Sequence, residues 1–440
     1  MPFMNKKAIA IICLMSSVVQ AQDLLETYDL ALQNDPFLRQ AAANKLAVGE
    51  KKDQSIARLL PTVTAIGSYS YQWQYQESFF NQKFPGQSPT NDYWDGRFTM
   101  NLVQPVFHWD QWVQLSQSEK QIAQAEASYV AEQQNLITKT TTAYFAVLAA
   151  QDNLEFIIAE KNAIGKQLEQ AQQRFEVGLI AITDVYEAQA GYDQSRSDEI
   201  AAINAVDNAK EALMEIIGFY SEELATLGKM LPLTQPIPNN LEAWNNSALA
   251  QNLQILIAKS ETEILQDTIE LQRSGHYPQL DIVSQIGFND NTGNIWAHGN
   301  TQSIGMQLNI PLFEGGAVNS RTREAEYQLA QANENLIATQ RAATKEVKNA
   351  YRGVMASISQ VKALEAAVIS GQSALEATNA GFEVGTRTMV DVLAATRNLT
   401  SAKSKYSQAR YEYLINGIRL KNVTNSLTRA DLDAINRYLN

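Results

Sequence analysis

The polar residues best placed for specific contacts follow two copies of one motif, Phe-Glu-Val-Gly, at Phe175–Gly178 and Phe382–Gly385. Thr183 and Asp184 come after the first copy, and Arg387 comes after the second. A guanidinium can bridge a carboxylate and a hydroxyl through charge-assisted hydrogen bonds, so these three side chains could hold one helix pair against the next. The alternative is that Thr183 and Asp184 only cap the start of a helix, as threonine and aspartate often do.

The sequence contains no constellation that would support catalysis or tight metal binding. Its three histidines, His108, His276 and His298, are scattered, and Cys13 is its single cysteine. It has neither a glycine-rich phosphate loop nor a nucleophile motif. We therefore expect no enzyme activity, no catalytic residue, no bound metal and no cofactor. The formal net charge of -12 also argues against a nucleic-acid partner.

Residues 1–21 have the pattern of a secretory signal peptide. Two lysines precede the apolar stretch Ala8–Met15, and small residues lead to a cleavage position after Ala21. We expect an exported mature chain; a retained membrane anchor is the alternative, although the stretch is too short to span a bilayer. Because Cys13 does not follow a small residue, we expect neither a lipid anchor nor disulfides.

The repeated motif is part of a tandem duplication of the chain. Ala143-Tyr144 returns as Ala350-Tyr351, and Pro105 returns as Pro311 at nearly the same offset. We expect two repeats joined by a linker that contains prolines and forms an equatorial belt. The expected boundaries are 22–218 for the first repeat, 219–245 for the linker and 246–440 for the second repeat.

Each repeat is expected to contain a very long helix. Residues 116–173 and 321–380 are rich in Ala, Gln, Glu and Leu and contain no proline. A helix of about sixty residues would be roughly 90 Å long. Small and apolar residues recur at spacings of three and four, which is typical of coiled-coil packing of closely spaced helices; the series are Ala325, Leu329, Ala332 and Leu336, then Ala343, Val347, Ala350 and Val354. A plain intramolecular bundle is the alternative.

Between the helices, each repeat has a β-hairpin, at about 62–106 and about 279–311. Apolar and polar residues alternate along 63–73, 98–102, 280–288 and 303–310. Strands of about ten residues suit a tilted crossing of a bilayer, and tyrosine and tryptophan gather toward their outer ends. A soluble β-sandwich is the alternative. Prolines are expected to end the strands, and the loops 76–96 and 289–302 are expected to face outside the cell.

Four strands cannot close a barrel, and open strand edges are not tolerated in lipid. The chain must therefore form an oligomer. A dimer would supply eight strands and a filled interior, whereas a trimer would supply twelve strands, enough for a pore. Three duplicated chains would also give six equivalent hairpins.

Several motifs together resemble the TolC family of outer-membrane efflux proteins over nearly the whole mature chain. They are Ala31–Pro36, Pro311–Gly316 and Val384–Thr388 followed by Asp391–Leu393. The resemblance implies an α+β membrane protein: a homotrimer with a 12-stranded β-barrel in the outer membrane, in contact with its lipid, continued by an α-helical barrel through the periplasm. It also implies a periplasmic adaptor protein and an inner-membrane transporter of the RND or ABC type as partners.

The resemblance also assigns roles to the residues after the two motifs. Thr183, Asp184 and Arg387 would form a gate lock at the periplasmic aperture, and Asp391 would form a constriction ring. This chain departs from the family pattern, because Ala394 replaces a second acidic residue and Phe382 replaces a tyrosine. A third departure is Phe107–Asp110, where the family has a Phe-x-Gly-Gly turn.

The expected function is a passive exit duct for drugs, secreted proteins or both. Motifs do not separate these cargoes or identify the adaptor and the pump. Metal-ion efflux is an alternative within the channel class, although no Met or His cluster is predicted to line the lumen. The alternative from another class is a surface coiled-coil protein that is structural or adhesive and forms no pore.

Overall fold

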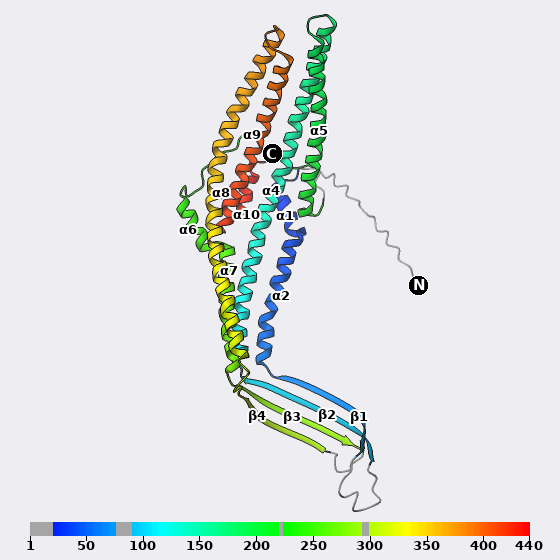
Figure 1. Ribbon diagram of the computed structural model, residues 1–440, viewed down its shortest axis with the longest axis vertical. Coiled ribbons are helices and arrows are strands. Elements are labelled where there is room, and N and C mark those ends of the chain that lie inside the picture. The colour runs from blue at the N-terminus through cyan, green and yellow to red at the C-terminus, as the bar shows by residue number, and fades with distance from the viewer. Residues whose placement is uncertain (1–20, 76–89, 220–222, 293–298) are drawn as a thin grey trace, which may run out of the picture. The chain divides into compact units, whose positions relative to one another are not determined.

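The computed structural model describes residues 21–75, 90–219, 223–292 and 299–440 (Figure 1). Most of the predicted signal peptide and the tips of both predicted hairpin loops therefore lie outside the described residues. Both halves have the same order of elements: helices, a β-hairpin, a very long helix and a shorter helix. The first half contains α1 (Leu24–Asn34), α2 (Pro36–Leu59), β1 (Thr62–Tyr75), β2 (Thr90–Phe107), α4 (Trp109–Glu176) and α5 (Ile182–Ile217).

The second half follows the segment predicted as a linker. It contains α6 (Leu241–Gln251), α7 (Leu253–Arg273), the short 3-10 helix η1 (Ser274–His276), β3 (Gln279–Asn291), β4 (Gly299–Asn309), α8 (Ala317–Glu383), α9 (Met389–Val423) and α10 (Arg429–Asn436). The predicted linker, 219–245, overlaps a helix at its end, because α6 begins at Leu241. Within the described residues, no helix is both long and apolar enough to cross a membrane.

The four predicted strands form one antiparallel sheet in the order β1-β2-β3-β4. Its register places most of the apolar residues of the four strands on one face. Val63 lies opposite Leu102, Met100 lies opposite Ile286, and Ile282 lies opposite Met306. Since side chains alternate between the faces of a strand, the other face carries most of the polar residues, with Ile66, Val103 and Val283 among them. The apolar face is exposed in the single chain, as Trp73 and Ile304 show at 78% and 79%.

Pro105 does not end the strand in which it lies, so this expectation was wrong. β2 continues to Phe107, and the pairing with β3 shifts register between Pro105 and Phe107. A bulge accommodates a residue that has no N–H to donate. The unusual Phe107–Asp110 segment follows at once, because α4 begins at Trp109. The ring nitrogen Nε2 of His108 lies 2.9 Å from the Asp281 carboxylate on β3, which fixes this tight strand-to-helix junction.

The two longest helices, α4 and α8, are 68 and 67 residues long. Both extend beyond the predicted ranges at each end. The predicted coiled-coil series on α8 matches its burial, since Leu329 and Leu336 are half-buried and the remaining six positions are buried. The small side chains at these positions allow neighbouring helices to approach closely.

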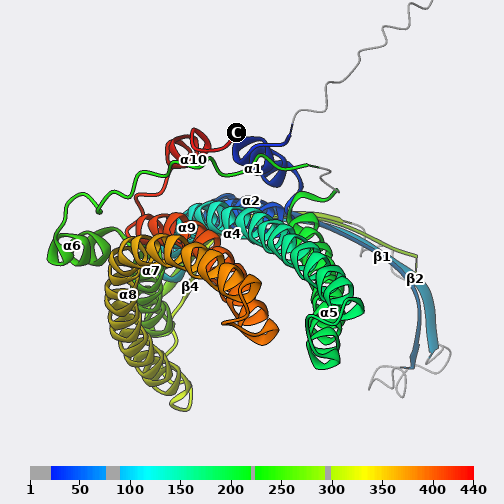
Figure 2. The same cartoon turned by 90° about the horizontal axis from the view of Figure 1, so that it is seen from above.

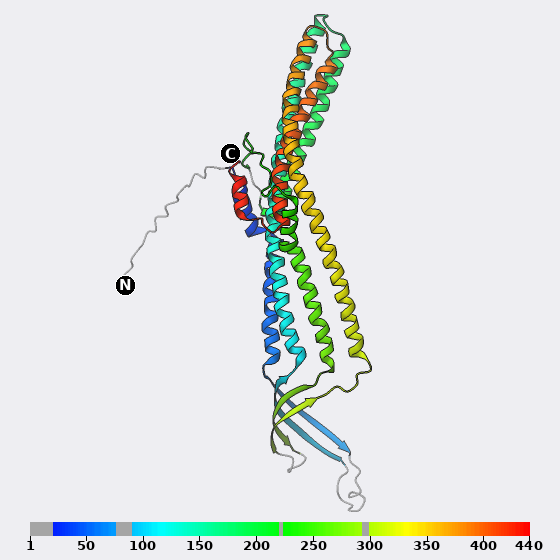
Figure 3. The same ribbon diagram turned by 90° about the vertical axis from the view of Figure 1, so that its left-hand side faces the viewer.

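The chain forms two compact units, each assembled from both repeats. The first unit contains residues 1–39, 132–250 and 344–440, and the second contains 40–131 and 251–343. In the second unit, α4 is joined to α7 by an ion pair of 2.7 Å between Lys120 and Asp267. In the first unit, α5 lies alongside α9 (Figure 3).

The core of the first unit also holds the ends of the described chain together. Tyr144 is fully buried; its hydroxyl donates a hydrogen bond to the carbonyl of Ala225 at 2.7 Å and lies 3.2 Å from the carbonyl of Gln22. Burial and the charge of Asp23 raise the pKa of this hydroxyl, so it remains a donor. The α1 and α10 helices lie side by side (Figure 2). The amide of Asn436 joins them by donating to the Asp23 carboxylate at 2.8 Å.

Candidate gate at the helix turns

All the predicted gate residues lie in or directly after two helix turns. The first turn joins α4 to α5 at residues 177–181, and the second joins α8 to α9 at residues 384–388. Gly178 and Gly385 adopt positive φ angles of 78° and 79°, which only glycine adopts without strain. The next N–H in each turn, of Leu179 or Thr386, reaches back five residues to a helix carbonyl. Both turns thus have the Schellman geometry that ends a helix at glycine.

The two helices that leave these turns begin differently. At α9, Thr388 is the N-cap residue, and the Asp391 carboxylate accepts hydrogen bonds from the Thr388 backbone N–H at 2.9 Å and from its hydroxyl at 3.0 Å. At α5, the N-cap residue is Ala181, which has no side-chain oxygen. Thr183 and Asp184 lie inside the first turn of α5 instead. The alternative that these two residues are the helix cap is therefore not what the structure shows.

The capping box changes the acidity of Asp391. The Thr388 backbone N–H, then the Thr388 hydroxyl, and then the charge of Arg387 hold the pKa of this carboxyl below its ordinary value. Asp391 is therefore ionised at neutral pH while remaining accessible to solvent. In an assembly of three chains, each chain would therefore carry one negative charge, from Asp391, at this turn.

The predicted lock is not formed within one chain. Arg387 and Thr183 are exposed and Asp184 is half-buried. Among the described residues, no hydrogen bond or ion pair joins the side chains of these three. The residues are near the ends of two helix pairs and available for contacts, but the single chain does not bring them together.

A hydrophobic cluster joins the two helix pairs next to the turns. It consists of Ile164, Leu168 and Ala171 from α4, Ala188 from α5, and Met389 and Leu393 from α9, with Phe382 of α8 packed against it. Glycine permits the close approach of α5 and α9: a Cβ added at Gly191 would lie 3.2 Å from the Leu393 side chain. This cluster holds the first repeat against the second at the position where a gate would separate them.

One contact at this position was not predicted. The guanidinium of Arg174, in the last turn of α4, lies 5.3 Å from the centre of the Phe382 ring. This distance is within the range of a cation–π interaction. The departure from tyrosine at Phe382 therefore leaves a ring that still contacts the other repeat. No local sequence signal indicates the pair, because its members lie in different repeats.

The remaining predictions about chemistry concern absences. Among the residues that the structure describes, no three His, Cys, Asp or Glu side chains are grouped so that they could hold a metal ion. Cys13 lies outside the described residues. Asp391 has no acidic neighbour one turn later, since that position is the exposed Ala394.

Comparisons with known proteins agree with this arrangement. The family described as Outer membrane efflux protein matches residues 27–219 and 244–426. The Outer membrane protein TolC of Vibrio cholerae is 40% identical over 430 residues, which are 97% of this chain and 95% of the relative. The Alkaline protease secretion protein AprF of Pseudomonas aeruginosa is 28% identical over 421 residues, which are 94% and 87% of the two chains.

A solved structure shows the same fold. The CmeC outer membrane channel of Campylobacter jejuni superposes with a TM-score of 0.81 at 17% sequence identity. The match covers 96% of this chain and 91% of that chain. The long helices and the four-stranded sheet thus occur together in a known channel protein, and the predicted fold class is confirmed.

Proposed function

Because the chain belongs to the outer membrane efflux protein family, we propose that it is the outer-membrane exit duct of a tripartite system. It conducts drugs, secreted proteins or both from an inner-membrane pump to the exterior. The duct is passive, and the pump supplies the energy. The relative named for alkaline protease secretion supports protein cargo, and the family description supports efflux.

The observation that carries this proposal is the four-stranded sheet with one apolar face. Within the described chain, β1 and β4 each have a single neighbouring strand, which leaves two open edges. In lipid, such edges must pair with other strands. A trimer satisfies them by placing the β4 edge of one copy against the β1 edge of the next. The twelve strands then surround a pore in the outer membrane, and the long helices continue it through the periplasm.

We further propose that the helix turns form the gate of this duct. In the closed assembly, Arg387 bonds Thr183 and Asp184 and locks the helix pairs together. Two observations support this role: Arg387 is exposed, and within the described chain no carboxylate lies within ion-pair distance of its guanidinium. Asp391 forms a single acidic ring at the aperture, where its charge favours cations. A periplasmic adaptor and an RND or ABC transporter are the partners that open the gate.

Single-channel conductance in a planar bilayer tests the proposal. Purified wild-type protein should give small, cation-selective steps, and Arg387→Ala should enlarge them because the lock contacts to Thr183 and Asp184 are lost. Arg352→Ala, which changes an arginine on α8 away from the turns, is the matched control and should leave the steps unchanged. No steps from a correctly folded oligomer would overturn the duct. Steps of equal size in wild type and Arg387→Ala would overturn the lock alone.

A further inference from the structure

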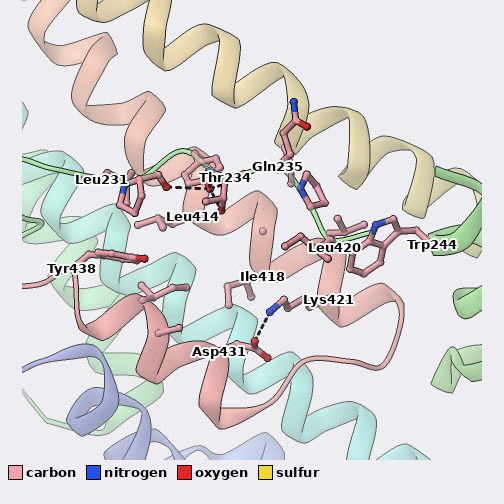
Figure 4. A pocket seen from close by; sticks show the side chains of 18 residues that line it. Leu231, Thr234, Gln235, Trp244, Leu414, Ile418, Leu420, Lys421, Asp431 and Tyr438 are labelled. Carbon is pink, nitrogen blue, oxygen red and sulfur yellow. Dashed lines mark hydrogen bonds and ion pairs between the residues drawn. The ribbon is translucent and has the colours of Figure 1, made fainter. Parts of the chain in front are cut away.

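The first unit contains a cavity that the proposed duct does not use. It has a volume of about 320 Å³ and lies between the extended residues 231–237, α6, α9 and α10 (Figure 4). Its walls are mostly apolar and include Leu231, Ile237, Trp244 and Ile418. This volume is near the lower end of the range for small-molecule sites in proteins.

A glycine forms part of the cavity wall without a packing reason. Gly417 lies inside α9, and a Cβ added there would meet no atom within 4 Å. By contrast, a Cβ at Gly353 on α8 would contact the Asn416 side chain at 3.4 Å. A glycine in a helix interior costs about 1 kcal/mol relative to alanine. Gly417 therefore leaves this part of the cavity wall without a side chain, at a cost in helix stability.

The polar groups of the cavity are few, and most are already paired. The Tyr413 hydroxyl accepts from the Thr234 N–H at 2.9 Å and contacts the Thr234 carbonyl at 3.1 Å. At another part of the wall, the Lys421 ammonium is paired with the Asp431 carboxylate, as Figure 4 shows. The second oxygen of Asp431 accepts from the N–H and hydroxyl of Thr428, at 2.7 and 3.0 Å.

This pairing leaves a donor-rich group at the cavity. An ammonium has three N–H donors, and Asp431 takes one of those of Lys421. The carboxylate oxygens of Asp431 are already occupied by Lys421 and Thr428, so this carboxylate has little capacity left for a cationic ligand. A ligand that extends to Lys421 would thus be favoured if it carried a negatively charged hydrogen-bond acceptor.

We propose that this cavity is a binding site for a small anionic amphiphile. An aliphatic or aromatic body fills the apolar space beside Gly417, and a carboxylate-like head bonds Lys421. The volume is too small for a folded peptide segment but suits a single small molecule. Occupancy would hold residues 231–237 against α9 and α10, because the ligand would contact all three.

Photo-crosslinking to the full-length oligomer tests the site. The probe is 4-benzoylbenzoate, a benzophenone with one carboxylate, and labelled peptides are located by mass spectrometry. Labels should fall in 231–238 or 413–421, and excess decanoate should reduce them at least about tenfold by competition. Labelling that is spread over the chain, or that decanoate does not reduce, would overturn the proposal.

Two variants test the parts of the site. Gly417→Leu fills the cavity and should reduce labelling by roughly tenfold or more. Gly49→Leu is its matched control, since Gly49 is also inside a helix with open space around its Cβ position but lies on α2. Equal labelling in Gly417→Leu and Gly49→Leu would contradict the site. If Gly417→Leu does not assemble, the milder Gly417→Ala and the decanoate competition decide.

The anionic head is tested separately. Lys421→Met should weaken labelling by 4-benzoylbenzoate by roughly tenfold, because a charge-assisted hydrogen bond is lost. Labelling by the neutral 4-benzoylbenzamide should change much less. Equal loss for both probes would show that Lys421 only supports the fold, and no loss for either would remove the anionic head from the proposal.

Discussion

Asp184 and Asp391 occupy equivalent positions after the two helix turns, yet their carboxylates have different surroundings. The N-cap residue three positions earlier is Ala181 in one copy and Thr388 in the other. Asp391 is therefore held by its own helix, whereas Asp184 has no cap to bond. The two copies thus differ at the N-cap position, so the Asp391 carboxylate is bonded within its own helix and the Asp184 carboxylate is not. This difference agrees with the proposal that Asp184 bonds Arg387 of the lock.

We predict that the charge of Asp391, rather than its cap, determines ion selectivity. Asp391→Asn keeps an oxygen that can accept the Thr388 hydrogen bonds but removes the charge. Asp391→Ala removes both. Both variants should therefore lose cation selectivity and divalent-cation block to a similar extent, which reversal potentials would measure. Selectivity retained in Asp391→Asn would assign the effect to the helix cap.

The lowered pKa of Asp391 predicts how selectivity depends on pH. A carboxyl whose pKa is lowered in the folded protein keeps its negative charge above that lowered pKa. It loses the charge, and with it the attraction for cations, as the pH falls through the lowered pKa. Cation selectivity should therefore persist through mildly acidic pH and disappear below the ordinary aspartate pKa of 3.8. Thr388→Ala, which removes one of the two bonds, should move the loss to higher pH. Reversal potentials across a pH series measure both midpoints, and identical midpoints would contradict the role of the Thr388 hydroxyl.

The pair of Arg174 and Phe382 should act as an additional latch between the repeats. Cation–π pairs at exposed positions contribute about 0.5–1 kcal/mol. Phe382→Leu and Arg174→Met should each increase the open probability, and the double variant should add little to either single change. Phe382→Tyr keeps the ring and should behave like wild type. Additive effects in this double-mutant cycle, measured as open probability in bilayers, would show that the two side chains act independently.

At the scale of elements, close contact between α5 and α9 depends on a glycine. Because a Cβ at Gly191 would lie 3.2 Å from Leu393, Gly191→Val should push these helices apart and raise the conductance. The second change Leu393→Ala should restore the smaller conductance, since it removes the obstructing side chain. Gly371→Val, at a site where a Cβ would have ordinary contact of 3.5 Å with Leu399, is the control. Equal effects of Gly191→Val and Gly371→Val would contradict the steric explanation.

The elements show which parts of the fold local sequence could predict. Alternation predicted all four strands, and the paired register then aligned residues such as Val63 and Ile282 on one face. Proline rules failed at Pro105, because a β-bulge lets the strand continue past it. The repeated Phe-Glu-Val-Gly motif marked the positions of both turns, but the unequal caps depend on the difference between Ala181 and Thr388.

Contacts between the repeats could not be predicted in this way. Arg174 lies in the last turn of the first repeat's long helix and Phe382 in that of the second, so α5, the second hairpin and several more helices lie between them. Patterns of residue spacing within one helix or strand therefore cannot predict their contact. The same holds for His108 and Asp281, which give the unusual Phe107–Asp110 segment a structural reason. The resemblance to a family indicated which residues to assign to the proposed gate. The residue types alone indicated only that these side chains could form charge-assisted hydrogen bonds.

At the scale of the whole molecule, duplication and oligomerisation have a common geometric reason. One chain supplies two hairpins in one sheet, and the sheet leaves an open edge at β1 and another at β4. Pairing these unlike edges between copies is a head-to-tail contact, which closes into a ring if the rotation is correct. Tandem repeats make the interfaces within and between chains similar, so a ring of three chains approximates a ring of six hairpins.

Engineered disulfides can test this closure. Ser68 lies on the polar face of β1, and Ser303, Gly305 and Gln307 lie on the same face of β4. Within one chain, β1 and β4 are three strand spacings apart, or roughly 14 Å, which is too far for a disulfide. A bond between a cysteine at Ser68 and one at a β4 position must therefore join two copies.

We predict that at least one of the pairs Ser68→Cys with Ser303→Cys, Gly305→Cys or Gln307→Cys forms this bond. Since Cys13 is the only native cysteine and lies in the predicted signal peptide, the mature chain would contain only the introduced thiols. Non-reducing gels should show covalent species of two and three chains, with the trimer as the largest. A ladder beyond three chains would indicate an open filament, because unlike edges that do not close continue to add copies. Cross-links that stop at two chains would favour a closed dimer of eight strands, whose interior side chains would fill, and would contradict the duct.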